Sequence, residues 1–294
     1  MMFSVYLMSE HSCICRNARL PGCDEVQIQG IRMQESSVQE LLCFGVAAGG
    51  GNPALVVQHD HRSAEQRQQF ARDSRKPACV FIDRSDGGAI VLDYFYPHMR
   101  SPLCLHATLA AARVLLSPQQ PALLVYTAMR HQPLTLILQD DEVFIQLSPQ
   151  ATPQVDIAPD LPGRLLGAPR IALASPPVIA SVGSPKLLLE VADRDTLHAL
   201  VPDLQAIADW SRQHGVSGCY VWCQRPDGAL EGRNLNHLDP AAEDGATGVA
   251  AGALTAHLQT GITLYQGANV GTPCLLRTEF RGENILIGGR TTPA

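Results

Sequence analysis

The sequence lacks three features that would each point to a particular class of protein. It has no apolar run that reaches the roughly 20 residues needed to span a bilayer. Its start, MMFSVYLMSEHSCIC, lacks the basic segment and the long apolar core of a signal peptide. It has no dense run of Lys or Arg, and its net charge is −6, so nucleic acids and membranes are not expected partners. These absences predict a cytoplasmic protein.

Metal-binding patterns are also missing, although the chain has nine cysteines. Cys13, Cys15 and Cys23 lie close together, but their spacing matches no common zinc motif. The HDH stretch at 59–61 follows an expected strand and is best explained as a solvated loop. In a reducing compartment most of the cysteines are expected to be free and buried. We therefore expect no metal site.

What the sequence does contain is ample apolar material and a modest internal repeat. With 294 residues, 46% of them hydrophobic, the chain can form two domains. GNPALVV (51–57) is similar to GSPKLLL (183–189), and HATLAAARVLL (106–116) is similar to GATGVAAGALTAHL (245–258). Each half therefore contains a strand motif followed at similar spacing by a helix of small residues, which favours duplication over a chance similarity between alanine-rich helices.

The expected organisation is an α+β protein of two similar halves, each a sheet around a central helix. Helices are expected at 63–73, 106–116, 194–212 and 246–259, among many strand-like segments. The proline-rich stretch 148–163 is expected to be a linker. The domains would be 35–150 and 151–294, with the final strand near 284–290 returning to the first half. Residues 1–34 stand outside the repeat, and no role is assigned to them.

The starts of the two small-residue helices carry the candidate chemistry. Helix N-termini present unpaired backbone N–H groups and the positive end of a dipole, which together hold anions such as carboxylates. Cys104 and His106 stand at the first start, where a thiol has a lowered pKa, and Glu243 and Asp244 stand at the second. An acidic residue there can also be only a cap. Two groups that face each other across a cleft could move a proton at carbon, with His106 as the preferred base.

These residues carry a resemblance to the PhzF-like isomerases of phenazine biosynthesis, which share the diaminopimelate-epimerase fold. Five motifs match the family in order, namely GGNPALVV (50–57), CLHATLAAA (104–112), SVGSPKLLLEV (181–191), EDGATGVAAGAL (243–254) and QGANVGTP (266–273). The resemblance implies two pseudo-symmetric domains, each a β-barrel-like sheet around a central helix, with a site between them. It also implies a homodimer that uses neither cofactor nor metal and moves a proton at carbon of a small carboxylate.

The match is incomplete at several family positions. The family glutamate that acts as acid and base is replaced by Ala78, with Cys79 beside it. Leu105 stands where the family has glycine, and Val249 where it has serine. Cys104 falls where the related epimerases and racemases have one catalytic cysteine, but their second cysteine would fall at Gly245.

The expected site therefore combines matching and altered residues. The expected catalytic residues are His106, Asp244 and Cys104, and the expected substrate-binding residues are Asn52, Leu105, Thr247, Gly248 and Val249.

Three hypotheses remain open from the sequence. The first is an isomerase or epimerase acting on an altered substrate. The second is a divergent member that binds a small carboxylate or a partner without turnover, which the loss of the glutamate favours. The third is a lyase or transferase that uses Cys104 as a covalent nucleophile.

Overall fold

The protein is described here from a computed structural model, which covers residues 36–47, 49–235 and 243–294. The extension 1–34 and its three cysteines lie outside the described residues. The elements of the first half are β1 (Ser37–Cys43), β2 (Asn52–Gln58), α1 (Ala64–Ser74), β3 (Cys79–Arg84), β4 (Ile90–Phe95), β5 (Arg100–Ser101), α2 (Leu105–Leu115), β6 (Ala122–Thr127), β7 (Pro133–Gln139) and β8 (Glu142–Leu147).

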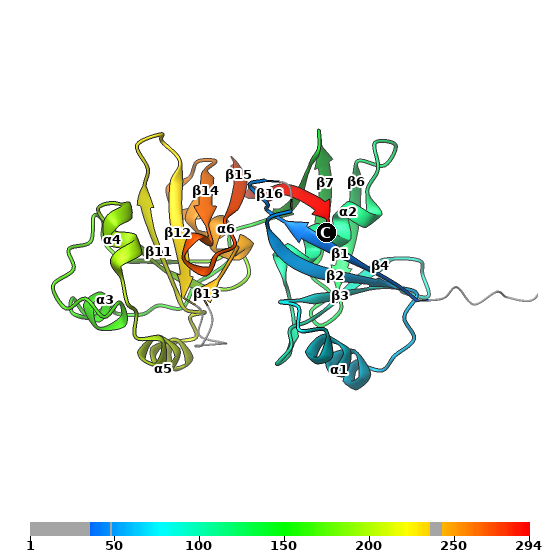
Figure 1. The fold of residues 1–294 in the computed structure, drawn as a ribbon, viewed down its shortest axis with the longest axis horizontal. Helices are drawn as coiled ribbons and strands as arrows, with labels where there is room; N and C mark the ends of the chain where they lie inside the picture. Colours follow the sequence, from blue (N-terminus) through cyan, green and yellow to red (C-terminus); the bar gives the residue numbers. More distant parts are fainter. Residues whose placement is uncertain (1–35, 48, 236–242) are drawn as a thin grey trace, which may run out of the picture. The chain divides into compact units, whose positions relative to one another are not determined.

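The remaining elements begin near the end of the proline-rich stretch (Figure 1). They are α3 (Leu161–Leu165), β9 (Val178–Ala180), β10 (Lys186–Glu190), α4 (Arg194–Ala199), α5 (Leu204–His214), β11 (Cys219–Gln224), β12 (Leu230–Leu235), β13 (Glu243–Asp244), α6 (Gly248–Leu258), β14 (Thr263–Gln266), the 3₁₀ helix η1 (Ala268–Val270), β15 (Cys274–Arg281) and β16 (Asn284–Pro293).

The two halves repeat one topology, strand for strand. In the first, β2 pairs with β1 antiparallel and with β3 parallel, and β4 pairs with β3 and β5 antiparallel and with β6 parallel. In the second, β10 has the same relations to β9 and β11, and β12 has the same relations to β11, β13 and β14. This element-by-element match supports the duplication that the sequence motifs suggested, and it confirms the α+β class.

The hydrogen-bonded strands form one continuous network, because β16 joins the two halves. β16 pairs with β15 on one side and with β8 on the other, and its end also pairs with β1. The pairing with β1 closes an eight-stranded barrel around α2. In the second half, the strands curve around α6. A hydrogen bond from Gln150 N–H to Ser181 C=O joins the segment after β8 to the segment after β9, where the first half has the β1–β16 ladder.

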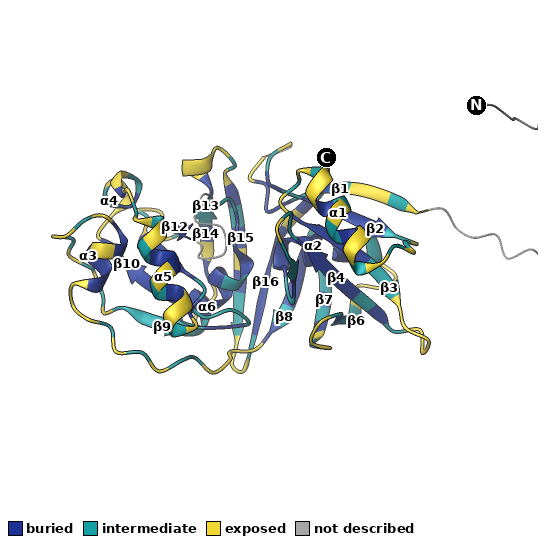
Figure 2. Ribbon diagram, turned by 90° about the horizontal axis from the view of Figure 1, so that it is seen from below, coloured by how far each residue is buried: buried dark blue, intermediate teal, exposed yellow. Residues whose placement is uncertain are grey.

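The central helices are built from small residues because the space inside a sheet of this curvature is narrow. Eight of the eleven residues of α2 are buried, four of them alanines. On α6, a Cβ added to Gly252 would lie 2.5 Å from the side chain of Ile287 and 2.6 Å from that of Val182, so only glycine fits there. The outer helices α1 and α5 instead show exposed faces (Figure 2).

Two expected boundaries differ from the structure. The helix expected at 194–212 is two helices, because Leu200 is extended and Pro202 disfavours helical backbone in the residue before it. The expected linker ends early, since α3 begins at Leu161 with Pro162 in its first turn, a position where proline is tolerated. The expected helices at 63–73, 106–116 and 246–259 are confirmed within two residues at each end.

Candidate functional site

The two central helices begin side by side. A Cβ added to Gly248, the first residue of α6, would lie 2.8 Å from the Cβ of Leu105, the first residue of α2. The outer helices α1, α4 and α5 have side-chain caps, from Ser63, Asp193 and Asp203. The N-cap residues of the central helices make no such hydrogen bond. Two uncapped, positive helix ends are therefore left beside each other.

A cavity of about 330 Å³ lies at these helix starts, within the size range of small-molecule sites. Its lining includes seven residues expected from the sequence, namely Cys104, Leu105, His106, Asp244, Thr247, Gly248 and Val249. Asn52 does not line it, but its side chain hydrogen-bonds to Asp244. The structure thus brings together all the residues of the predicted site, from segments far apart in the chain.

Cys104 and His106 form a buried pair at the start of α2. Their side chains meet with Sγ 3.5 Å from Nδ1, and the residues are 3% and 7% exposed. Burial opposes ionisation of Cys104, but the charge of His106 and hydrogen bonds from His106 and Tyr96 outweigh it, so the pKa of the thiol is lowered. Burial likewise opposes protonation of His106, but the Cys104 charge and hydrogen bond, with Asp244, raise its pKa.

These opposite pKa shifts favour a thiolate–imidazolium pair. The Nε2 atom of His106 is buried and has no hydrogen-bond partner among the described residues. Because a ring nitrogen left without a partner in the interior is unfavourable, this atom is available to a ligand. In such a pair the imidazolium would be the acid and the thiolate the base, the reverse of the role expected for His106.

Asp244 is held in place at the start of α6 by contacts from both halves. Its carboxylate accepts hydrogen bonds from Asn52 Nδ2 at 3.2 Å and from Thr247 Oγ1 at 2.5 Å. The Gln266 Nε2 atom donates to the Asp244 backbone carbonyl at 2.8 Å. Glu243, the other acidic residue considered at this start, is instead paired with Arg233 at 2.8 Å. Only one of the two carboxylates therefore serves the cavity.

The helix starts also correct the expected equivalence between halves. The N-cap of α2 is Cys104, and the N-cap of α6 is Thr247. The position that corresponds to Cys104 is thus Thr247 and not Gly245, as the sequence similarity suggested. An added Cβ on Gly245 would lie 2.4 Å from Thr272 Oγ1, so this glycine allows a close approach of two loops.

The position of the missing glutamate offers no replacement group. Ala78 is fully buried, its carbonyl accepts a hydrogen bond from Leu55 N–H at 3.0 Å, and it does not line the cavity. The neighbouring Cys79 is buried as well, and burial raises its pKa. Both residues pack the core, so any proton transfer depends on the helix starts.

Eleven further residues of the cavity lining were not expected, and three of them have basic or amide side chains. These three are Arg130 in the β6–β7 turn, Lys186 at the start of β10 and Asn234 near the end of β12. Lys186 ends the SVGSPK part of a motif quoted above, and a lysine in an apolar strand was the signal that could have drawn attention to it. Asn234 had no such signal, because an amide in a strand reads as an ordinary polar position.

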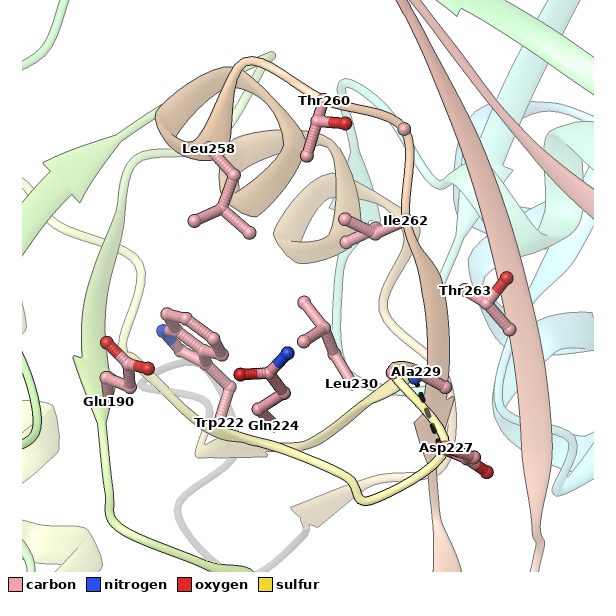
Figure 3. Close-up of a pocket in the computed structure, with 12 residues that line it drawn as sticks. Glu190, Trp222, Gln224, Asp227, Ala229, Leu230, Leu258, Thr260, Ile262 and Thr263 are labelled. Atoms are coloured by element: carbon pink, nitrogen blue, oxygen red, sulfur yellow. Dashed lines mark hydrogen bonds between the residues drawn. The ribbon is translucent and has the colours of Figure 1, made fainter.

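A second, larger cavity lies at the other end of α6. Its volume is about 760 Å³, and its lining includes Trp222, Gln224, Leu258 and Thr260 (Figure 3). It shares no lining residue with the cavity at the helix starts. It contains no cysteine or histidine, and its Asp227 carboxylate accepts a hydrogen bond from Ala229 N–H at 3.1 Å. The smaller cavity, with its paired titratable groups, is therefore the candidate active site.

The described residues contain neither a metal-binding cluster nor a membrane-spanning helix. No group of three or more Cys, His, Asp or Glu side chains is placed to hold a metal ion in that part of the chain. None of its helices has the length and apolar character required to cross a membrane.

Comparison with known proteins adds a family match and several relatives. The family model described as phenazine biosynthesis-like protein (PhzC-PhzF) matches residues 42–292. An uncharacterized isomerase of Deinococcus radiodurans is 30% identical over 284 residues, covering 85% of this chain and 90% of that protein. A trans-2,3-dihydro-3-hydroxyanthranilate isomerase of Pseudomonas aeruginosa is 27% identical over 250 residues, covering 80% of this chain and 87% of that protein.

A solved structure agrees on the fold. The crystal structure of a Bacillus anthracis phenazine biosynthesis protein of the PhzF family superposes with a TM-score of 0.73 and 20% sequence identity. The match covers 89% of this chain and 98% of that chain. At this identity the likeness establishes the shared architecture of two sheets around central helices.

Proposed function

Because this chain belongs to the phenazine biosynthesis-like PhzC-PhzF family, we propose that it is an isomerase that moves a proton at a carbon atom of a small carboxylate. One observation carries this proposal. The buried Cys104–His106 pair and the Asp244 carboxylate line the same cavity, beside two uncapped helix starts. Acid, base and anion site are thereby provided by the protein itself, so the proposal includes no cofactor.

The helix starts would hold the substrate carboxylate. The first backbone N–H groups of α2 and α6 and the positive ends of both dipoles favour a negative charge at this place. When a proton leaves the adjacent carbon, its electron pair spreads into the carboxylate. The same N–H groups then stabilise the added charge, as preorganised donors do in other enzymes.

The proton would move between groups on the two helix starts. The Cys104 thiolate takes the proton from carbon and becomes a thiol, while the His106 imidazolium donates through Nε2 to a substrate oxygen. The substrate oxygen returns its proton to His106, and Asp244 takes up a proton from water and delivers it to carbon. The Cys104 thiol then releases its proton to water, which restores the thiolate. This assignment differs from the expectation that His106 is the base, and it follows the opposite pKa shifts of the pair, which favour a proton on the imidazole.

Substrate-binding roles follow from position in the cavity. Leu105 and Val249 offer apolar side chains, and Thr247 and Gly248 offer the uncapped end of α6. Asn52 acts through its hydrogen bond to the Asp244 carboxylate and so positions that group.

Carbon-bound hydrogen exchange in D₂O, followed by proton NMR or mass spectrometry, tests the proposal. A panel of amino acids and cyclic acids should include compounds that exchange with the wild-type protein. His106→Asn should slow the exchange by about 10²–10⁴, the usual contribution of acid–base catalysis, and Cys104→Ser and Asp244→Asn should also slow it. Cys79→Ser is the matched control, because Cys79 is a buried thiol outside the cavity and its Sγ lies 3.7 Å from the Ser74 hydroxyl. It should leave the rate unchanged.

A non-catalytic carboxylate-binding protein is the second candidate, and the buried Ala78 favours it. The isomerase and the binding protein predict different results in the exchange experiment. If no compound of the panel exchanges, while a carboxylate still raises the melting temperature, the binding function replaces the enzymatic one. A mass increase on Cys104 after incubation with a substrate would instead indicate a covalent nucleophile.

Location and assembly complete the proposal. The six cysteines among the described residues are free and buried, as is typical of a reducing compartment, and this supports a cytoplasmic protein. A homodimer is proposed from the family resemblance alone, and sedimentation equilibrium tests it.

A further inference from the structure

The two halves differ at one pair of equivalent strand positions, and the residue of the second half lines the cavity. Tyr94 on β4 stands opposite Val80 on β3 and Ser101 on β5. In the second half, Asn234 on β12 stands in the same relation to Tyr220 on β11 and Asp244 on β13. The repeat thus places an asparagine where the first half has a tyrosine.

The tyrosine hydroxyl has a hydrogen-bond partner, and the asparagine amide has none among the described residues. Tyr94 is fully enclosed, and its hydroxyl lies 2.8 Å from Thr108 Oγ1. Asn234 is 1% exposed, and neither its Oδ1 nor its Nδ2 has a hydrogen-bond partner among the described residues. An amide buried in this way is unfavourable unless something else bonds to it.

A second substitution between the halves lies at the same cavity. Leu55 on β2 pairs with Cys79, and Leu187 on β10 pairs with Cys219, so the residues just before them, Ala54 and Lys186, are equivalent. Ala54 packs in the core. Lys186 is 3% exposed and lines the cavity, and its Nζ donates to the carbonyl of Ser217.

Lys186 has one hydrogen-bond acceptor among the described residues, although an ammonium group has three N–H donors. A buried charge requires an opposite charge or several hydrogen bonds. The second half therefore carries an ammonium and an amide, both incompletely bonded, in the wall of one cavity. A ligand with an anionic oxygen pair would satisfy both.

We propose that Lys186 and Asn234 form a subsite for a second carboxylate of the substrate, so that the enzyme acts on a small dicarboxylate. The proposal rests on the proposed function, in which the first carboxylate occupies the helix starts. Lys186 N–H and Asn234 Nδ2–H donate to the distal carboxylate, and Arg130, which is exposed at the same cavity, adds a second positive charge.

The charges of the cavity agree with a dianionic ligand. Lys186 and Arg130 contribute two positive charges, Asp244 contributes a carboxylate, and the Cys104–His106 pair is neutral as a whole. The two helix starts each add roughly half a positive charge. Burial lowers the pKa of Lys186 to about 8, with Asp244 acting in the opposite direction, so the ammonium form still prevails at neutral pH.

Matched acid and amide pairs test the subsite by calorimetric titration. The pairs are L-aspartate with L-asparagine, L-glutamate with L-glutamine, and succinate with succinamate. Each pair has one shape and differs in one charge. In at least one pair the acid should bind about tenfold or more tightly, as expected for a charge-assisted hydrogen bond.

The variants assign the preference to the subsite. Lys186→Met should remove most of the acid-over-amide preference while leaving amide binding intact, and Asn234→Ala should reduce the preference without abolishing it. Lys76→Met is the control, because Lys76 lies outside the cavity and pairs with Glu40 at 2.6 Å. Circular dichroism of each variant shows whether it is folded. The absence of an acid preference in every pair, or a preference that survives Lys186→Met, overturns the proposal.

The same measurements separate this inference from the proposed function. Binding of a dicarboxylate that depends on Lys186, without carbon exchange, would leave the subsite standing and remove the isomerase. Exchange with dicarboxylates, at a rate and an apparent affinity that Lys186→Met does not change, would keep the isomerase and overturn the subsite.

Discussion

Replacing Lys186 with methionine should stabilise the protein while it weakens ligand binding. Methionine has a similar length and no charge, so the strand and its packing can be kept. Lys186 is almost fully buried at the start of β10, and its ammonium has the Ser217 carbonyl as its hydrogen-bond acceptor. The folded protein therefore holds a charge that water would solvate better.

The size of the effect follows from the pKa. Burial lowers the pKa of Lys186 from 10.5 to about 8, and one pKa unit corresponds to about 1.4 kcal/mol. Below pH 8 the folded state therefore carries a penalty of about 3 kcal/mol. Loss of the hydrogen bond to Ser217 lowers the free energy of unfolding by about 1 kcal/mol. The net effect of Lys186→Met should therefore be an increase of about 2 kcal/mol in the free energy of unfolding at pH 7.

The gain should depend on pH in a defined direction. Between about pH 8 and pH 10.5 the unfolded chain holds the Lys186 proton and the folded chain does not. In this pH range the free energy of unfolding of the wild type therefore rises with pH, and the extra stability of the variant disappears. The groups whose charges act on Lys186 are Asp244 and Cys219, and both are retained in the variant.

Urea denaturation at pH 7, 8.5 and 10 measures this difference, with Lys76→Met as the control for loss of a lysine paired at the surface. A variant that unfolds at lower urea than wild type at pH 7 would refute the reasoning, as would an advantage that stays constant from pH 7 to 10. A confirmed gain would indicate stability given up for binding, a common trade at functional sites.

Three further outcomes test the site. Iodoacetamide should alkylate Cys104 faster than an ordinary thiol at pH 7, because the imidazolium lowers the pKa of the thiol. His106→Asn should slow this reaction, and equal rates for the variant and the wild type by peptide mass spectrometry would show that the pair is not ionised. Gly248→Ala should lower the free energy of unfolding by about 1–3 kcal/mol, since its Cβ would meet Leu105 at 2.8 Å. Adding Leu105→Gly, the family residue, should recover part of that loss, and strictly additive effects would contradict the contact. Asn52→Ala should slow carbon exchange about tenfold by freeing the carboxylate that it holds, and an unchanged rate would exclude this positioning role.

Much of the fold could be predicted because its signals are local or repeated. The small-residue helices and the Gly-x-Pro-x-Leu strand motifs recur in both halves, and the structure places them in equivalent elements. The break between α4 and α5 was missed, although Pro202 signals it, because the helical pattern continues on both sides.

The candidate site was predictable only in part. Cys104, His106 and Asp244 come together as expected, because helix starts are visible in the sequence and the repeat relates them. The prediction that Gly245 corresponds to Cys104 is wrong, because matching residue types along two helices ignores where each helix begins. Thr247 became evident once both N-caps were located.

The sequence by itself determined the family and the α+β class, and it placed the candidate residues at the helix starts, since each of these depends on residues that are neighbours in the chain. Only the tertiary structure decided that Ala78 is enclosed in the core, and that Lys186 and Asn234 share a cavity with the reactive pair. Lys186 and Asn234 lie on different strands, and whether a strand side chain points to a core or to a cavity depends on register and on what packs against it. The burial of an ammonium and an amide without full hydrogen bonding likewise depends on how the sheets assemble, so it could not be predicted from a single segment of the sequence.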